Sequence, residues 1–172
     1  CWMFAALNTF RHKMIAGFQL EDFELSQAHT FFWDKYEKSN WFLEQVIATA
    51  DQDLTSRKVS FLLQTPQQDG GQWDMVANLV EKYGLVPQSL YPDSFNATNS
   101  HAMDRLITTK LREDALRLRK MASSKDARVL ASLAGAKEKM MREVHLIITL
   151  MLGPPPSPTK EFKWEYYDKD GN

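Results

Sequence analysis

The sequence predicts an α+β protein that is mainly helical, and two observations carry this prediction. Apolar residues recur at helical spacing over most of residues 2–152, with breaks at glycine, proline and polar clusters. After a proline-rich stretch at 153–158, aromatic and charged residues alternate, which is typical of a half-buried strand. The 172 residues, 44% hydrophobic and 25% charged, are enough for a domain with a real core.

The first half of the chain is predicted to form four helices, at residues 2–16, 26–50, 53–63 and 72–83. The first is apolar on most faces and is expected to end before Gly17, which suits a left-handed cap. Ser26 is expected to cap the second helix. Asp53 or Thr55 is expected to start the third, and Pro66 to stop it.

A polar loop at residues 67–71 precedes the fourth helix and contains two adjacent glycines. Without a Cβ, Gly70 and Gly71 can adopt positive φ or lie close against a ligand, although a simple turn is the plainer interpretation. The fourth helix is expected to end at Gly84, with residues 85–92 extended and 96–100 in a loop. Its predicted inward-facing residues are Trp73, Val76, Leu79 and Val80.

Two long helices, at residues 100–122 and 127–152, are predicted to pair as an antiparallel hairpin. Between Arg105 and Arg142 there are eleven Lys/Arg and four Asp/Glu, although the whole chain has a formal charge of −1. A solvated outer face explains this charge most simply, and contact with a polyanion is the alternative. The predicted inward stripes are Met103, Ile107, Leu111, Ala115 and Leu118, then Leu130, Leu133, Met140, Val144, Ile147 and Met151.

The last residues predict one strand. Phe162, Trp164 and Tyr166 alternate with Lys163, Glu165 and Tyr167, and the turn signal Asp170-Gly171 follows. We therefore expect the start of a β-hairpin here.

The single cysteine, Cys1, stands at the head of the first helix. The positive end of a helix stabilises a thiolate, so Cys1 is a candidate nucleophile, with a buried packing thiol as the alternative. His12 lies about 16 Å further along the same helix and cannot reach Cys1, and His29 could do so only through tertiary contact. Because the chain begins at Cys1 and not at a methionine, we expect a fragment or a processed product.

The sequence lacks the motifs that are typical of several other kinds of site. The four histidines are too scattered for a metal site, and no CxxC, HExxH, P-loop or serine nucleophile elbow occurs. One cysteine fits a reducing compartment, and no apolar run is long enough for a membrane helix. We therefore expect no metal, no cofactor and no membrane partner.

Several motifs together resemble papain-like cysteine proteases in order and spacing. They are Cys1-Trp2, Leu25-Ser26-Gln27, Asp69-Gly70-Gly71-Gln72-Trp73, Tyr83-Gly84-Leu85 and Tyr91-Pro92. Others are similar to the branch of bleomycin hydrolases and bacterial aminopeptidases C. These are Phe23-Glu24-Leu25-Ser26-Gln27, Phe31-Phe32-Trp33-Asp34-Lys35, Lys110-Leu111-Arg112-Glu113, Trp164-Glu165-Tyr166 and Asp168-Lys169-Asp170.

The resemblance implies a papain-like fold of which this chain is the mainly helical half. Residues 1–99 would form the helical half of the catalytic domain, 100–153 a helical insertion, and 154–172 a linker with the start of a β-hairpin. Cys1 would be the nucleophile, with its backbone N–H as one oxyanion donor. Trp2 would lie beside the cleft, and Asp69, Gly70 and Gly71 would bind substrate.

The activity implied is that of a cysteine aminopeptidase, which cleaves peptide or amide bonds through a thioester without a cofactor. Peptide substrates, a homohexameric ring and a cytoplasmic location follow from the same resemblance. Its glutamine oxyanion donor would precede Cys1, and its histidine and asparagine would follow Asn172, so the fragment alone is expected to be inactive. His29 and Thr30 depart from the tyrosine and leucine usual in the branch.

Two further functions remain open from the sequence. The chain could be a non-catalytic helical interaction module with Cys1 as a packing thiol. The basic helical hairpin could bind nucleic acid.

Overall fold

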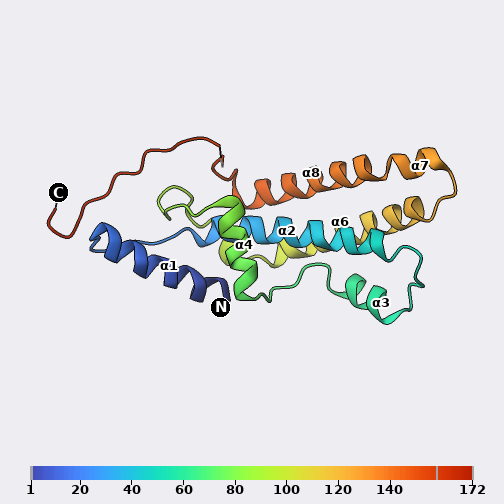
Figure 1. The fold of residues 1–172 in the computed structure, drawn as a ribbon, viewed down its shortest axis with the longest axis horizontal. Coiled ribbons are helices and arrows are strands. Elements are labelled where there is room, and N and C mark those ends of the chain that lie inside the picture. Colours follow the sequence, from blue (N-terminus) through green and yellow to red (C-terminus); the bar gives the residue numbers. More distant parts are fainter. Residues whose placement is uncertain (1, 158, 172) are drawn as a thin grey trace.

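The computed structural model describes residues 2–157 and 159–171, which form eight helices. Figure 1 shows an elongated molecule in which α2, α6 and α8 run side by side, with α1 at one end. None of the helices in the described part of the chain is long and apolar enough to cross a membrane. The helices are α1 (Trp2–Phe18), α2 (Gln27–Ala48), α3 (Arg57–Gln64), α4 (Trp73–Tyr83), α5 (Phe95–Thr98), α6 (His101–Ala122), α7 (Ala127–Ala131) and α8 (Leu133–Leu152).

The main core lies between α2, α6 and α8. The five residues predicted as the inward stripe of α6 are all fully buried, which confirms that stripe. In α8, Met140 and Val144 are buried as predicted, but Ile148 and Leu152 replace Ile147 and Met151 as the fully buried positions. Because the helix packs against both α2 and α6, a face wider than one stripe is covered. The division of the chain at residues 99 and 153 stays a prediction.

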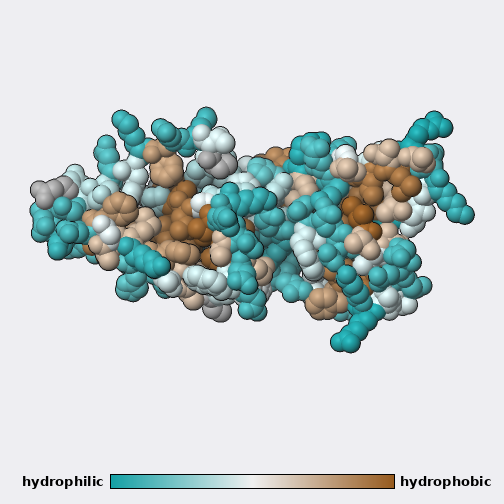
Figure 2. Space-filling view, viewed as in Figure 1, coloured by the Kyte–Doolittle hydropathy of each residue, from teal (hydrophilic) through white to brown (hydrophobic). Residues whose placement is uncertain are grey.

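Exposed apolar atoms gather at two places on the face drawn in Figure 2. One lies between α1 and the C-terminal segment, and the other lies toward α7 and the beginning of α8. Hydrophilic side chains cover most of the surface between them. The exposed Leu130 of α7, which the sequence placed inward, belongs to this second end of the molecule.

Two predicted helix caps are confirmed. The Oγ of Ser26 accepts a hydrogen bond from the backbone N–H of His29 at 3.1 Å and so caps α2. Gly84 follows α4 with φ of 73°, a conformation that glycine adopts without steric cost. The third helix begins later than predicted, after Ser56, because Asp53 accepts hydrogen bonds from Thr55 in a turn that precedes the helix.

The predicted end of α1 at Gly17 is wrong. Gly17 lies inside α1, and Gln19 is the residue with left-handed backbone, at φ of 55°. The N–H of Leu20 then donates to the carbonyl of Ile15 at 3.1 Å, and both side chains join one hydrophobic cluster. Burial of Leu20 therefore decides where the helix ends.

Replacing Gly17 by alanine is expected to raise the free energy of unfolding by about 0.5–1 kcal/mol. A Cβ at this position meets no heavy atom within 4 Å, so only the helix propensity changes. Urea unfolding of the matched proteins measures the effect. Gln19→Gly is the companion variant, expected not to destabilise, since glycine tolerates the positive φ. A loss of stability in Gly17→Ala would show that Gly17 serves as a cap after all.

The predicted strand and hairpin start at residues 162–171 do not form within the described residues. The segment makes an isolated bridge between Leu20 and Asp168, and the N–H of Lys169 donates to the carbonyl of Gln19 at 2.8 Å. Its alternating aromatic residues pack on side chains instead: the Trp164 ring lies 5.0 Å from the ring of Phe23. Figure 1 shows this segment running back toward the end of α1. Within the described residues, the alternation therefore serves ring packing.

Three smaller expectations also differ from the structure. Residues 95–98 form the short helix α5, capped by Ser94, where a loop was predicted. The helix predicted over 127–152 is divided at Ser132. Trp73, predicted to face inward, is 54% exposed because its ring stacks on Phe10 of α1 and not on the main core.

Candidate active site

The start of α1 is the place to which the sequence assigned the nucleophile. Cys1 lies outside the described residues, so the geometry is built around Trp2, its neighbour in the chain. The half-buried Trp2 contacts both the main core and the cluster that α1 forms with the loop after it. The first turn of α1 contains no acidic side chain, so no carboxylate there offsets the positive end of the helix dipole.

The indole of Trp2 is held by the 67–71 loop. Its Nε1–H donates to the backbone carbonyl of Asp69 at 2.8 Å. Gly71 lies against the same ring, since a Cβ built on Gly71 would stand 2.5 Å from the Cε2 atom of Trp2. No real Cβ approaches so closely, and only glycine fits here without displacing the indole. The structure thus brings together three of the predicted site residues: Trp2, Asp69 and Gly71.

Gly70 differs from Gly71 in its surroundings. A Cβ on Gly70 would meet nothing within 4 Å, so the chain itself leaves open space at this position. The residue is exposed, as is the side chain of Asp69. The loop therefore presents backbone at Gly70 to solvent while its next residue is pressed onto Trp2.

A buried lysine for which the sequence predicted no role in the site lies beneath this loop. The side chain of Lys35 in α2 is 1% exposed, and its Nζ lies 2.9 Å from Oδ1 of Asp69 and 3.0 Å from Oδ1 of Asp104 in α6. Burial disfavours the ammonium, but the two carboxylates outweigh it and raise the pKa of Lys35 above its usual value. The hydrogen bond and charge of Lys35 lower the pKa of Asp69. Lysine is almost never fully buried unless it is paired.

Lys38 lies one turn further along α2. Its Nζ stands 5.1 Å from the ring centre of Trp2 and 2.8 Å from Oδ2 of the buried Asp34. Burial raises the pKa of Asp34, and the neighbouring lysines partly oppose that shift. The polar residues Asp34 and Lys35 within the apolar run of α2 were the available sequence signal for this cluster. What they bind could not be inferred, because their partners are distant in the chain.

His29 is buried away from this loop. Its Nε2 accepts a hydrogen bond from the indole N–H of Trp33 at 3.2 Å, while its Nδ1 has no partner among the described residues. Desolvation lowers the pKa of His29 from 6.5 to about 4. The neighbouring Thr30 also buries a hydroxyl without a partner in the described chain. These two positions are where the sequence departed from the resembled branch.

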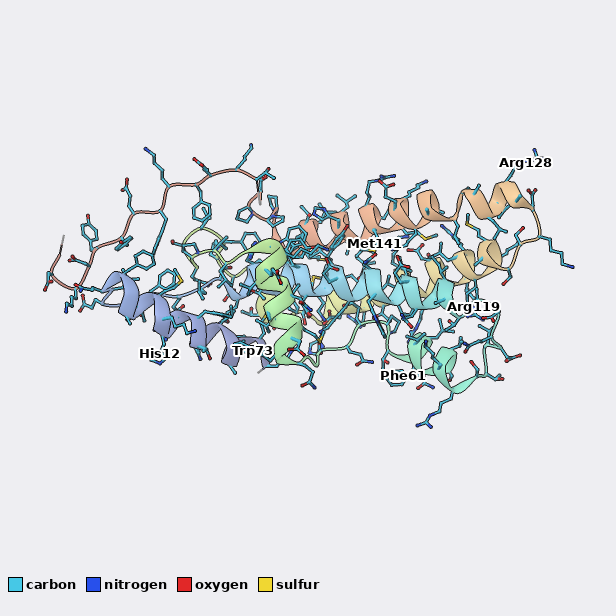
Figure 3. All side chains as sticks on the ribbon, in the orientation of Figure 1. His12, Phe61, Trp73, Arg119, Arg128 and Met141 are labelled. Carbon is cyan, nitrogen blue, oxygen red and sulfur yellow. The ribbon has the colours of Figure 1, made fainter. Side chains whose placement is uncertain are left out.

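Of the other histidines, His145 and His12 do not join the candidate site, whereas the charge of His101 at the start of α6 contributes to the lowered pKa of Asp69. The ring of His145 packs among aromatic rings of α2, at 5.3 Å from that of Phe32. His12 lines a shallow cavity of about 250 Å³ on α1, and Figure 3 shows it on the side of α1 opposite the C-terminal segment. Within the described part of the chain, no histidine hydrogen-bonds to Trp2, Asp69 or Gly71. A general base for Cys1 is therefore not identified among them.

Many basic side chains of the 105–142 stretch tie helices together. Arg112 donates to the carbonyls of Leu63 and Gln64, and Arg119 donates to the carbonyl of Thr49 at 2.8 Å. Others form ion pairs: Lys110 with Asp114 and Glu143, Lys137 with Glu44, and Arg142 with Glu138. Arg128 lies at the far end of the molecule from Trp73 in Figure 3. The basic stretch thus has structural roles and extends away from the candidate site.

No group of three or more His, Cys, Asp or Glu side chains among residues 2–157 and 159–171 is placed to hold a metal ion.

Known proteins match this chain over its whole length or nearly so. The sequence profile of the Peptidase C1-like family covers residues 1–172. Aminopeptidase C of Streptococcus thermophilus is 58% identical over 173 residues, which are 100% of this chain and 38% of that protein. Cysteine proteinase 1, mitochondrial, of Saccharomyces cerevisiae (strain YJM789) is 45% identical over 174 residues, 99% of this chain and 35% of that protein.

A solved structure gives the same result. The crystal structure of PepW from Lactobacillus rhamnosis HN001 (DR20) superposes with a TM-score of 0.94 at 53% identity, covering 100% of this chain and 37% of that one. The chain thus spans little more than a third of the length of the relatives that it matches. The resemblance drawn from the motifs around Trp2 and the 67–71 loop is confirmed, and the chain belongs to the Peptidase C1-like family.

Proposed function

We propose that the protein to which this chain belongs is a cysteine aminopeptidase that cleaves peptide or amide bonds. The observation that carries the proposal is the contact between Gly71 and the indole of Trp2. It places a glycine loop with open space at Gly70 directly beside the neighbour of the only thiol. The matched relatives named Aminopeptidase C support the same assignment.

In this proposal the thiolate of Cys1 attacks the carbonyl carbon of the scissile bond. The carbonyl π electrons move to oxygen, and the backbone N–H of Cys1 donates to the resulting oxyanion. Collapse of this adduct forms a thioester and releases the amine, which takes a proton from a general acid. Water then attacks the thioester, returning the thiol and releasing the carboxylic acid. The peptide lies along the loop at Gly70, whose backbone is exposed and has open space beside it, while Gly71 rests against Trp2.

The remaining parts of the proposal come from the family resemblance. The base histidine and its asparagine partner would lie beyond Asn172, and the glutamine oxyanion donor before Cys1, so the 172 residues alone should be inactive. A homohexameric ring and a cytoplasmic location are proposed on the same ground. The alternatives, an interaction module with a packing thiol or a nucleic-acid-binding hairpin, are less favoured. Neither alternative requires the close contact between Trp2 and Gly71. Many of the basic side chains already form ion pairs or hydrogen bonds within the protein.

The proposal predicts a reactive thiolate at Cys1 in the full-length protein. The rate of alkylation by iodoacetamide, followed against pH, should show an inflection well below about 8.5, the value of a free thiol. Cys1→Ser should lower kcat/KM for an aminoacyl p-nitroanilide by about 10³-fold or more. Gly135→Ala, in open space on α8, is the matched control with unchanged activity. Slow alkylation without a low-pH inflection would instead support the interaction module.

A further inference from the structure

One buried cation holds the loop that carries Gly70 and Gly71. We infer that Lys35 is a positioning residue for the candidate active site, because it fixes the 67–71 loop against the start of α1. The inference rests on the proposed function, since it assigns Lys35 an effect on peptide binding at that site. Lys35 acts through Asp69 and not by touching the reacting atoms.

Four hydrogen bonds hold the loop, two at Gln67 and two at Asp69. The side-chain amide of Gln67 donates to the backbone carbonyl of Lys35 at 3.2 Å and to the Oγ of Ser39 at 2.6 Å. The Nζ of Lys35 donates to Oδ1 of Asp69 at 2.9 Å. The backbone carbonyl of Asp69 then accepts from Nε1 of Trp2 at 2.8 Å. The ammonium of Lys35 thus binds the carboxylate of Asp69, and the indole of Trp2 binds the backbone carbonyl of the same residue.

The close contact between Gly71 and Trp2 restricts where the loop can lie. Gly71 approaches the indole of Trp2 so closely that a single added carbon would overlap the ring. Such a contact survives only if the loop has one position relative to α1. Asp69, two residues earlier, supplies both the carbonyl that meets Trp2 and the carboxylate that meets Lys35. The charge on Lys35 therefore sets where Gly71 lies.

The two carboxylates that bind Lys35 differ in exposure, and this difference indicates which of them has a positioning role. Lys35 is 1% exposed, whereas the side chain of Asp69 is 84% exposed. Burying an ammonium costs free energy, and pairing it with an exposed carboxylate recovers only part of that cost. The second partner, Asp104 of α6, is 22% exposed and lies 3.0 Å away. Asp104 keeps the buried charge compensated, while Asp69 is the partner that belongs to the loop.

The test uses the full-length protein with Lys35→Met, Asp69→Asn, Asp104→Asn and the double variant Lys35→Met/Asp69→Asn. For an aminoacyl p-nitroanilide, KM should rise by about tenfold in Lys35→Met and in Asp69→Asn, with a smaller change in kcat. The double variant should be no worse than Lys35→Met, since both remove one interaction. Asp104→Asn is the matched control with a smaller effect on KM, because the pair between Lys35 and Asp69 remains.

A second readout follows Cys1 directly. Iodoacetamide is small and does not need the loop, so its rate should stay the same in Lys35→Met. A peptidyl chloromethyl ketone must lie along the loop, so its rate should fall by about tenfold. Equal slowing of both reagents would show damage to the fold and would overturn the positioning role.

Two other results would contradict the positioning role of Lys35. If Lys35→Met and Asp104→Asn were equally harmful while Asp69→Asn had no effect, Lys35 would serve only the packing of α2 on α6. If the effect of Asp69→Asn persisted in the Lys35→Met background, Asp69 would contact substrate directly. Both results contradict the inference with the proposed function intact. If Lys35→Met failed to fold, the KM of Asp69→Asn, a change at an exposed position, would still test the positioning role. A wild-type protein without thiol-dependent turnover would overturn the proposed function and this inference with it.

Discussion

Replacing Gly71 by alanine is expected to disable the candidate site more than the same replacement at any other glycine of this chain. The new Cβ would stand 2.5 Å from Cε2 and 2.6 Å from Cδ2 of Trp2, so the loop and the indole must separate. Such a separation of the loop from the indole, directly beside a nucleophile, can lower kcat/KM by about 10²-fold. Overpacking should also lower the free energy of unfolding by about 1–3 kcal/mol. Turnover of an aminoacyl p-nitroanilide and urea unfolding measure the two effects.

Gly70→Ala is the matched control for stability. Its Cβ would meet nothing within 4 Å, so the free energy of unfolding should change by about 0.5 kcal/mol or less. Trp2→Ala provides a second check, because removing the indole removes the obstacle. In that background the stability penalty of Gly71→Ala should disappear. Wild-type stability and turnover in Gly71→Ala would contradict the close contact between Gly71 and Trp2.

The second large effect is a loss of stability in weak acid caused by His29. The pKa of His29 is lowered from 6.5 to about 4 because its ring is desolvated in the core. Between these values the unfolded chain binds a proton at His29 that the folded chain does not. Stability therefore falls as pH drops from about 6.5 to about 4, by about 3 kcal/mol over the whole window. Urea unfolding at several pH values measures this fall.

His29→Gln is the control for this pH dependence. Its side-chain carbonyl can replace Nε2 as the acceptor for the Trp33 N–H, and it does not titrate. The difference in stability between wild type and His29→Gln should therefore change with pH across that window, while carboxylates common to both proteins cancel. Parallel stability curves for the two proteins would show that His29 is protonated equally in the folded and unfolded chains.

Local sequence patterns predicted most of the helical structure. The stripe of α6 from Met103 to Leu118 is fully buried as expected, and Ser26 and Gly84 cap α2 and α4. These features depend on spacing and on the backbone of one or two residues, so they can be recognised within a short stretch. The motifs around Trp2 and the 67–71 loop also indicated the family that the comparisons confirm.

Several of the wrong expectations have one cause, which is that packing overrode a local preference. Gly17 suits a helix end, but burial of Leu20 moves that end to Gln19. Trp73 has the character of a core residue, yet it stacks on Phe10 at the surface. The alternation around Trp164 fits a strand, yet the ring packs on Phe23 and the segment has one isolated bridge. Phe10 lies 63 positions from Trp73, and Phe23 lies 141 positions from Trp164.

The sequence by itself determined the helical layout, the single thiol and the glycine pair, because each depends on residue identity and short-range spacing. Only the tertiary structure decided that Lys35 lies under the loop, joined to Asp69 and Asp104, which are 34 and 69 positions further along the chain. The same is true of the contact between Trp2 and Gly71. A buried charge or a missing Cβ has meaning only through the atoms that surround it, and packing of distant segments supplies those atoms.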